Sequence, residues 1–261
     1  MKTLVLDFYK NDMKKVIISL LGIAISVAMS AQTLSALDIV KKADSKMRGE
    51  SSYSEMTMTI VRPTWQRSIS MKAWTKGTTF ALIKVTAPAK DKGTGFLKRD
   101  KELWNWVPSI DRLIKMSASV MGQSWMGSDF TNDDMVRESS MVTDYTQKIL
   151  AEEDVRGFHC YKIEMTPLPN AAVVWGKVIT WIEKGTFNII RTQNLDENFE
   201  LVQTMENYDF KQFGDRLLPS RMEMTPASGK GQKTVITTSK AQYNIPMQES
   251  FFSQQNLKTI K

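Results

Sequence analysis

The chain has 261 residues, of which 42% are hydrophobic and 24% charged, and its net charge is +7. This composition is that of a globular protein and excludes a fibrous repeat or a disordered chain. The basic residues are spread along the sequence, which argues against the basic patch that nucleic-acid binding requires. The single cysteine, Cys160, excludes an intrachain disulfide, so the fold must depend on its core.

The N-terminal segment has the three parts of a secretory signal peptide. Lys14 and Lys15 precede the apolar run 16–28, and small residues follow at Ser30 and Ala31. The run is shorter than the roughly 20 residues that span a bilayer. We therefore predict a cleaved signal peptide over residues 1–31, with an uncleaved membrane anchor as the alternative. Because residues 1–31 hold four Lys and two Asp, the rest of the chain carries +5.

The remaining residues, 32–261, show no interior linker and no second apolar run of spanning length. Cys160 lies far from the expected cleavage site, so the N-terminus is not expected to be lipidated. These features predict a Sec-exported, soluble, periplasmic protein with a single domain, which we expect to be a monomer.

The elements after the signal begin with one helix, which Ser35 is expected to cap and which ends at Arg48-Gly49. Strands with two-residue alternation follow, separated by Gly and Pro turns. Residues 117–145 interrupt the alternation, and Asn132 is expected to cap a short helix there. Residues 146–156 are left unassigned. The strands are expected at residues 54–61, 66–75, 78–86, 96–97, 102–107, 112–116, 158–166, 174–183, 187–195, 201–210, 217–225 and 234–244.

This pattern predicts a mainly β fold. About 10–11 strands with a few helices indicate a single, strongly curved antiparallel sheet, either a closed barrel or an open half-barrel that helices cover. The segment without alternation, 117–145, is the natural cover for an open face.

Catalytic chemistry finds little support in the sequence. The only histidine, His159, adjoins Cys160, and neighbours in one strand point to opposite faces, so they are not expected to form a nucleophile–base pair. No metal-ligand or phosphate-loop motif is present. The acidic cluster Asp129, Asp133 and Asp134 suggests either a cation site or a solvated turn with helix-capping carboxylates. We expect no enzyme activity, no metal and no cofactor.

Tryptophan and methionine are the more informative residues. Trp104 and Trp106 share one face of a strand, and Trp175 and Trp181 share parity in another. Thioethers and indoles together make a deformable apolar wall, which suits a mobile acyl chain. The alternative is an ordinary protein core.

Residues 93–135 carry a signature that resembles the LolA-like outer-membrane lipoprotein-sorting protein family, as a distant branch. The features are Phe96-Leu97, Trp104-x-Trp106-x-Pro108, Arg112, and Gly127-Ser128-Asp129-Phe130 followed by Asp133-Asp134. The resemblance continues through Tyr161–Pro167 and Trp175–Glu183. It implies an open antiparallel half-barrel (LolA/LolB-like) whose apolar concave face receives the acyl chains of a lipid or lipoprotein.

The function we predict is a periplasmic carrier, or chaperone, that moves lipid or lipoprotein acyl chains toward the outer membrane. An inner-membrane exporter and an outer-membrane acceptor are its expected partners. The alternatives are a non-catalytic envelope adaptor, which would bind an exporter or another protein, and a periplasmic hydrolase. Arg112 is a candidate for contacting a cover element or a head group, or else a surface charge. The expected cavity wall is Trp74, Phe80, Trp104, Trp106, Trp125, Met126, Phe130, Trp175 and Trp181.

Overall fold

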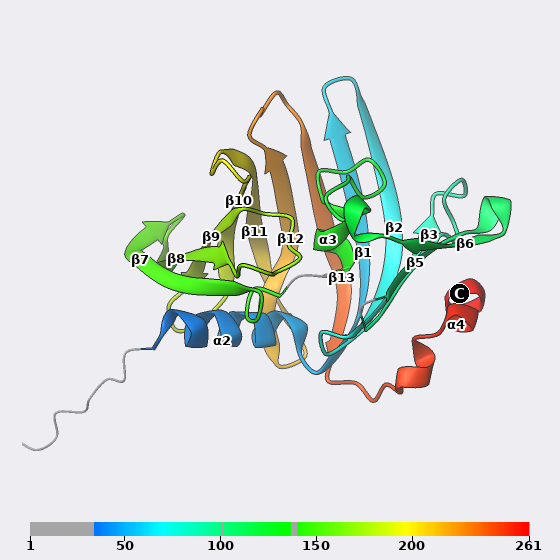
Figure 1. Cartoon of the computed structure of the whole chain (residues 1–261), viewed down its shortest axis with the longest axis horizontal. Helices are drawn as coiled ribbons and strands as arrows, with labels where there is room; N and C mark the ends of the chain where they lie inside the picture. Colours follow the sequence, from blue (N-terminus) through cyan, green and yellow to red (C-terminus); the bar gives the residue numbers. More distant parts are fainter. Residues whose placement is uncertain (1–33, 101, 137–139, 261) are drawn as a thin grey trace, which may run out of the picture. The chain divides into compact units, whose positions relative to one another are not determined.

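A computed structural model of the chain describes residues 34–100, 102–136 and 140–260 (Figure 1). The expected signal peptide, residues 1–31, lies outside the described residues. Contacts divide the chain into Met1–Leu34 and Ser35–Lys261, and every element below belongs to the second unit. None of the described helices has the length and apolar character needed to span a bilayer.

The first described helix, α2 (Ala36–Arg48), begins and ends where the sequence predicts. The Ser35 hydroxyl caps it by accepting a hydrogen bond from the Asp38 amide at 3.1 Å. Gly49, at φ 65°, ends it in the left-handed region that favours glycine. Its buried side chains, Ile39, Val40 and Ala43, recur at helical spacing and pack toward the sheet.

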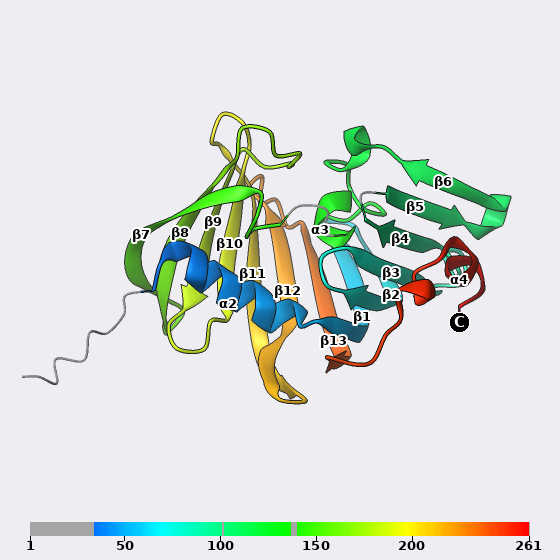
Figure 2. The same cartoon turned by 60° about the horizontal axis from the view of Figure 1, so that its bottom comes forward.

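The described strands form one antiparallel sheet of 13 strands, in the order β6-β5-β4-β3-β2-β1-β13-β12-β11-β10-β9-β8-β7 (Figure 2). The first and last strands, β1 and β13, pair at its centre. The strands are β1 (Ser51–Arg62), β2 (Trp65–Lys76), β3 (Phe80–Ala87), β4 (Gly95–Arg99), β5 (Glu102–Val107), β6 (Arg112–Met116), β7 (Tyr145–Val155), β8 (Phe158–Pro167), β9 (Lys177–Glu183), β10 (Ile189–Leu195), β11 (Leu201–Phe213), β12 (Arg216–Pro226) and β13 (Lys233–Tyr243).

This strand order explains the position of the mid-chain insertion. The two edge strands, β6 and β7, follow one another in the sequence. The connection between them, residues 117–144, must therefore cross from one edge of the sheet to the other. It carries the short helices η2 (Ala118–Val120) and α3 (Asn132–Val136), of which α3 lies over the sheet (Figures 1 and 2). The expected cover over an open sheet face is thus a consequence of topology.

The predicted fold class, a mainly β open half-barrel with a few helices, is confirmed. The 13 strands exceed the expected 10–11, and one of the additional strands is edge strand β7, which contains most of the unassigned segment 146–156. Along β7 only Tyr145 and Val155 are buried. An edge strand with so little burial does not need alternating apolar residues, so its sequence carries no strand pattern. The strand expected at 174–183 begins only at Lys177.

The helix in the insertion is capped differently from the prediction. We expected Asn132 as its cap, but the Asn132 side chain instead donates a hydrogen bond to the Val120 carbonyl at 2.8 Å. Thr131 is the cap: its hydroxyl accepts from the Asp134 amide at 3.0 Å, and the Asp134 carboxylate accepts from the Thr131 amide at 2.8 Å. This reciprocal pair satisfies two amides at the start of the helix.

The inner face of the sheet is the one that the insertion covers. Its core includes Met58 and Ile60 of β1, Met71 of β2, and Trp125 and Phe130 of the insertion. Two-residue alternation places the next side chains on the opposite, outer face.

The C-terminal segment after β13 covers part of the outer face. It contains η3 (Glu249–Phe251) and α4 (Gln254–Thr259). Phe252 is fully buried and stacks on Phe80 with a ring-centroid distance of 5.3 Å. Buried Lys84 of β3 donates hydrogen bonds to the Leu257 carbonyl at 2.7 Å and the Lys258 carbonyl at 3.3 Å, and so caps the end of α4.

Candidate functional site

A cavity of about 320 Å³ lies on the inner face. Strands β1–β3 and β10–β13 contribute most of its wall, and the end of α2 and the helix α3 complete the lining. The volume lies at the lower end of the range of ligand pockets in proteins, about 300–1,000 Å³. Of the aromatic side chains in its lining, Phe80, Phe130, Tyr145 and Trp175 come from four separate segments of the chain.

Methionine dominates the apolar lining. On the sheet, Met205 of β11 pairs directly with Met224 of β12, and Met222 follows on the same face of β12. An unbranched thioether adopts several shapes at low cost, so such a wall adapts to ligands of different length or branching. The methionines that line the cavity are Met47, Met56, Met135, Met141, Met205, Met222 and Met224.

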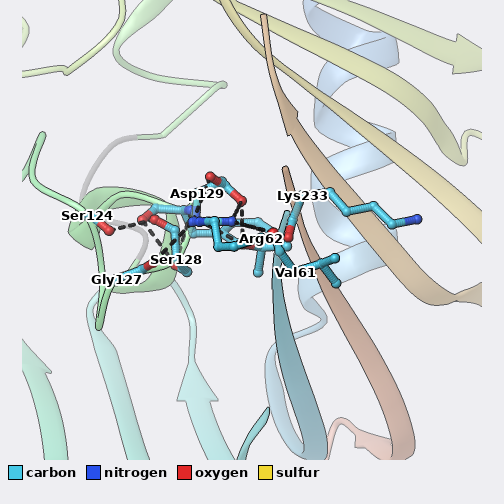
Figure 3. Close-up of polar contacts among 9 residues, drawn as sticks. Val61, Arg62, Ser124, Gly127, Ser128, Asp129 and Lys233 are labelled. Atoms are coloured by element: carbon cyan, nitrogen blue, oxygen red, sulfur yellow. Dashed lines mark hydrogen bonds and ion pairs between the residues drawn. The ribbon is translucent and has the colours of Figure 1, made fainter. Parts of the chain in front are cut away.

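The cover is fixed to the sheet by a buried ion pair (Figure 3). The Arg62 guanidinium, at the end of β1, donates to both Asp129 carboxylate oxygens, each at 3.0 Å, and to the Gly127 carbonyl at 3.2 Å. Thr234 of β13 donates to the same carboxylate at 2.6 Å and accepts from the Asp129 amide at 3.0 Å. These contacts hold the Gly127–Phe130 turn so that Phe130 lies in the cavity wall.

The acidic cluster is only in part what the sequence suggests. Asp134 is a helix-capping carboxylate, as expected. The expectation of a solvated turn is wrong, because the Asp129 side chain is 8% exposed and Asp133 is 4% exposed. Asp129 is engaged by Arg62 and Thr234. Among the described residues, no group of acidic, His or Cys side chains has the arrangement needed for a metal ion.

One end of the cavity is polar. Asp133 and Asp134 line it together with Tyr145 and Trp175. Burial raises the pKa of Asp134, and its hydrogen bonds with Thr131 oppose that rise. The pKa of Tyr145 is raised by burial and by the charges of Asp133, Asp144 and Asp134. The lining is therefore not wholly apolar, because the Asp133 and Asp134 carboxylates and the buried Lys98 lie beside the methionine wall.

Asp134 gives the first testable prediction. Burial raises the pKa of Asp134 in the folded protein above its value in the unfolded chain, about 3.9. Its contribution to the free energy of unfolding is therefore fully present below the unfolded pKa and is lost as pH rises through the folded pKa. Asp134→Asn keeps an oxygen that can accept the hydrogen bond from the Thr131 amide, but its side chain cannot ionise. We expect its free energy of unfolding, relative to that of the wild-type protein, to increase between about pH 4 and pH 8.

Urea denaturation of both proteins at pH 4, 6 and 8 measures this difference. Asp100→Asn, at an exposed turn after β4, is the matched control and should show no such trend. A difference for Asp134→Asn that is independent of pH would contradict the prediction.

The structure distributes the predicted wall residues over three places. Phe130 and Trp175 line the cavity, and Phe80 also lines it although its ring stacks on Phe252 in the cluster under the C-terminal segment. Trp125 and Met126, in the insertion, pack in the core of the inner face, where the Trp125 ring lies 5.2 Å from that of Phe96. The remaining residues lie elsewhere.

Four of the predicted wall residues contact the outer face instead. Trp74, Trp104 and Trp106 pack with Phe80 around Phe252 and Leu257 of the C-terminal segment. Trp181 packs with Cys160 in a separate outer cluster. Trp104 and Trp106 do share a face, as predicted, but parity alone does not say which one.

The parity argument for Trp175 and Trp181 fails because β9 begins at Lys177, so Trp175 precedes the strand. Trp175 lies in the cavity wall, whereas Trp181 alternates with cavity-lining Val178 and points to the opposite face. Arg112 begins edge strand β6 and is exposed.

His159 and Cys160 lie as the sequence predicts, with the His159 side chain 56% exposed and Cys160 fully buried. Burial raises the pKa of the Cys160 thiol to about 11, which leaves it protonated at neutral pH and unreactive as a nucleophile.

Sequence reasoning missed two parts of the site. Met47 and Met135 lie on helices, where strand parity does not apply, and Met141 lies in a loop. Arg62 pairs with a residue 67 positions later in the chain, which no local pattern reveals.

Comparisons with known proteins place the chain among known folds. A protein-family model described as "Uncharacterized protein" matches residues 77–259, which is more than half of the chain. No curated protein matches the sequence significantly. A DUF1329 family protein from Desulfovibrio piger is 24% identical, with a TM-score of 0.77, over 85% of this chain and 97% of its own.

Two further solved structures are similar. A domain described as an outer membrane lipoprotein-sorting protein, from Vibrio parahaemolyticus, is 22% identical with a TM-score of 0.76, over 85% of this chain and 98% of its own. A LolA superfamily protein from Nitrosomonas europaea is 20% identical with a TM-score of 0.74, over 85% of this chain and 99% of its own. At these identities, the likeness is one of fold.

Proposed function

The chain belongs to the family whose model matches residues 77–259 and has a LolA-like fold, and on this basis we propose that it carries lipid or lipoprotein acyl chains. The observation that supports this most directly is the methionine-walled cavity on the inner face. Each methylene that enters such a cavity contributes about 0.8 kcal/mol. A few methylenes therefore give useful affinity that remains reversible.

Transport adds a direction to binding. We propose that residues 1–31 direct export, that residues 32–261 form the soluble periplasmic domain, and that it acts as a monomer without catalysis. A donor such as an inner-membrane exporter would load the cavity, and an acceptor at the outer membrane would empty it. Release requires a partner that offers the chain a better site or favours an open form of the cover.

Native mass spectrometry with lipid extraction tests the proposal on the purified protein. A carrier is expected to co-purify with lipid, or to bind a fluorescent fatty-acid probe at micromolar concentration. An empty protein that also ignores the probe would overturn the proposal and favour the adaptor alternative, in which the inner face binds a protein.

Two substitutions in the cavity sharpen the test. Met222→Glu places a charge in the apolar wall, and Ala73→Leu fills part of the space without adding charge. We expect each to weaken probe binding tenfold or more, because a lost place for about two methylenes costs that factor. Fluorescence titration measures the affinity.

The matched control is Ile114→Glu, which adds the same charge at a 46% exposed position of β6 outside the cavity. Its probe affinity should equal that of the wild-type protein. Circular dichroism establishes that each variant is folded. Equal loss of binding in Ile114→Glu and Met222→Glu would contradict a role for the cavity.

A further inference from the structure

A second depression lies at one end of the strands, where β9 and β11 end and β10 and β12 begin. Its walls are α2, the turn Gly185–Phe187 and the hairpin Gln212–Leu217, and its volume is about 740 Å³. No residue lines both this depression and the methionine cavity. The two therefore are distinct sites that share the helix α2 as a common wall. We call it the basic groove.

Four cations line the basic groove: Lys41, Lys42 and Lys46 of α2, and Arg216 of β12. Among the described residues, Asp215 is the one carboxylate in its lining; it is 82% exposed and lies 3.7 Å from Arg216 Nε. The groove thus has an excess of positive charge, whereas the chain without residues 1–31 has a modest net charge of +5. Such a concentration attracts anions.

Two of these cations are held in place by backbone contacts. Arg216 donates to the Ser45 carbonyl at 2.9 Å and the Lys46 carbonyl at 2.7 Å, and Lys46 donates to the Thr186 carbonyl at 2.7 Å. Arg216 Nε is buried and makes no hydrogen bond within the described part of the chain. Lys41 and Lys42 are exposed. The groove therefore combines two cations that backbone carbonyls hold in place with two exposed lysines at its rim.

Apolar side chains accompany the charges. The Lys42 ammonium lies over the Phe187 ring, 5.2 Å from its centroid, and Leu217 is 42% exposed. A free phosphate would use the cations but neither apolar group, and the groove is far larger than one phosphate. The head-group region of a membrane offers both negative charge and apolar contact.

We propose that the basic groove binds the phosphate-bearing head groups of an anionic lipid bilayer. The domain would then rest on a membrane surface through the strand ends and the helix α2 that border the groove. This inference goes beyond the cavity's acyl ligand, because membrane docking does not require the cavity to be filled.

Co-sedimentation with vesicles tests the proposal on the full chain. The vesicles contain phosphatidylcholine alone or phosphatidylcholine with about one third phosphatidylglycerol. We expect binding to the anionic vesicles that weakens with added salt. Since each lysine near an anionic surface contributes about a fivefold factor, Lys41→Glu/Lys42→Glu should reduce partitioning about 25-fold or more.

The matched control is Lys90→Glu/Lys92→Glu, which makes the same charge change at exposed positions between β3 and β4, at the opposite end of the strands. Residues 1–33 are identical in all three proteins, so any contribution of theirs cancels. Partitioning of the control close to that of the wild-type protein supports the groove. Equal weakening in both variants, or equal binding to neutral and anionic vesicles, would overturn it.

Two further measurements separate the remaining outcomes. Inorganic phosphate at constant ionic strength should leave vesicle binding unchanged, and displacement by it would overturn the membrane assignment in favour of a free phosphate. Fatty-acid probe binding, measured on the same variants, should be unaffected. A protein that binds anionic vesicles through Lys41 and Lys42 but ignores the probe would retain the groove while the carrier proposal fails.

Discussion

Replacing Arg62 with Met is expected to lower the free energy of unfolding by about 3–5 kcal/mol. The Arg62 and Asp129 side chains are only 15% and 8% exposed, and the guanidinium makes two bonds to the carboxylate. Without Arg62, the Asp129 charge stays buried with Thr234 as its remaining side-chain hydrogen-bond partner among the described residues. That loss is large because the desolvation of the carboxylate is no longer offset.

Urea denaturation measures the effect, and Arg67→Met is the matched control. Arg67 also pairs with an aspartate, Asp91, but the Arg67 and Asp91 side chains are 35% and 15% exposed, so the substitution should cost less, about 1–2 kcal/mol. The double variant Arg62→Met/Asp129→Leu removes both charges and should recover much of the loss. Equal costs for Arg62→Met and Arg67→Met would contradict the prediction.

The same substitution has a local consequence. Gly127 and Asp129 are the points at which Arg62 holds the insertion, and Phe130 reaches the cavity from there. We expect Arg62→Met to increase proteolytic cleavage within residues 117–136 relative to the rest of the chain.

Local patterns in the sequence specify much of this fold. Ser35 and Gly49 fix both ends of α2, and two-residue alternation identifies most of the strands. Alternation does not identify the edge strand β7, because this strand buries few side chains on either face. The pairing of β1 with β13 is also not local, since its partners are separated by most of the chain. That pairing sets the sheet order and sends the insertion across the inner face.

The site was harder to predict than the fold for a related reason. Alternation shows that Trp104 and Trp106 lie on one face, but both faces of this sheet bury apolar side chains. Which face holds the cavity depends on what covers it: the insertion covers one, and the C-terminal segment covers part of the other. The Gly127–Phe130 signature marks the insertion that covers the inner face. The role of Arg62 is recognised only once β1 is placed beside that insertion.

The C-terminal segment provides a test of this division. Phe252→Ala is expected to lower the free energy of unfolding by about 3–5 kcal/mol, as for other fully buried phenylalanines. Phe252 stacks on Phe80 and lies edge-on to Phe251, with centroid distances of 5.3 Å each. Its loss leaves a cavity between α4 and the sheet, and Lys84 and Leu257 then carry more of the contact.

Tryptophan fluorescence and urea denaturation measure the outcome together. Trp74, Trp104 and Trp106 pack around Phe252, so we expect a red shift of emission in Phe252→Ala. Phe199→Ala, at a 56% exposed position where the Lys177 ammonium lies 4.3 Å from the ring centroid, is the control and should change stability by no more than about 1 kcal/mol.

The same variant separates the two faces functionally. If the acyl site is the methionine cavity, fatty-acid probe affinity in folded Phe252→Ala should stay within about twofold of wild type, because Phe252 does not line that cavity and contacts its wall through Phe80. If Trp104 and Trp106 formed the ligand wall, opening the cluster around Phe252 would alter probe binding strongly. Unchanged stability with reduced probe affinity would therefore move the acyl site to the outer face.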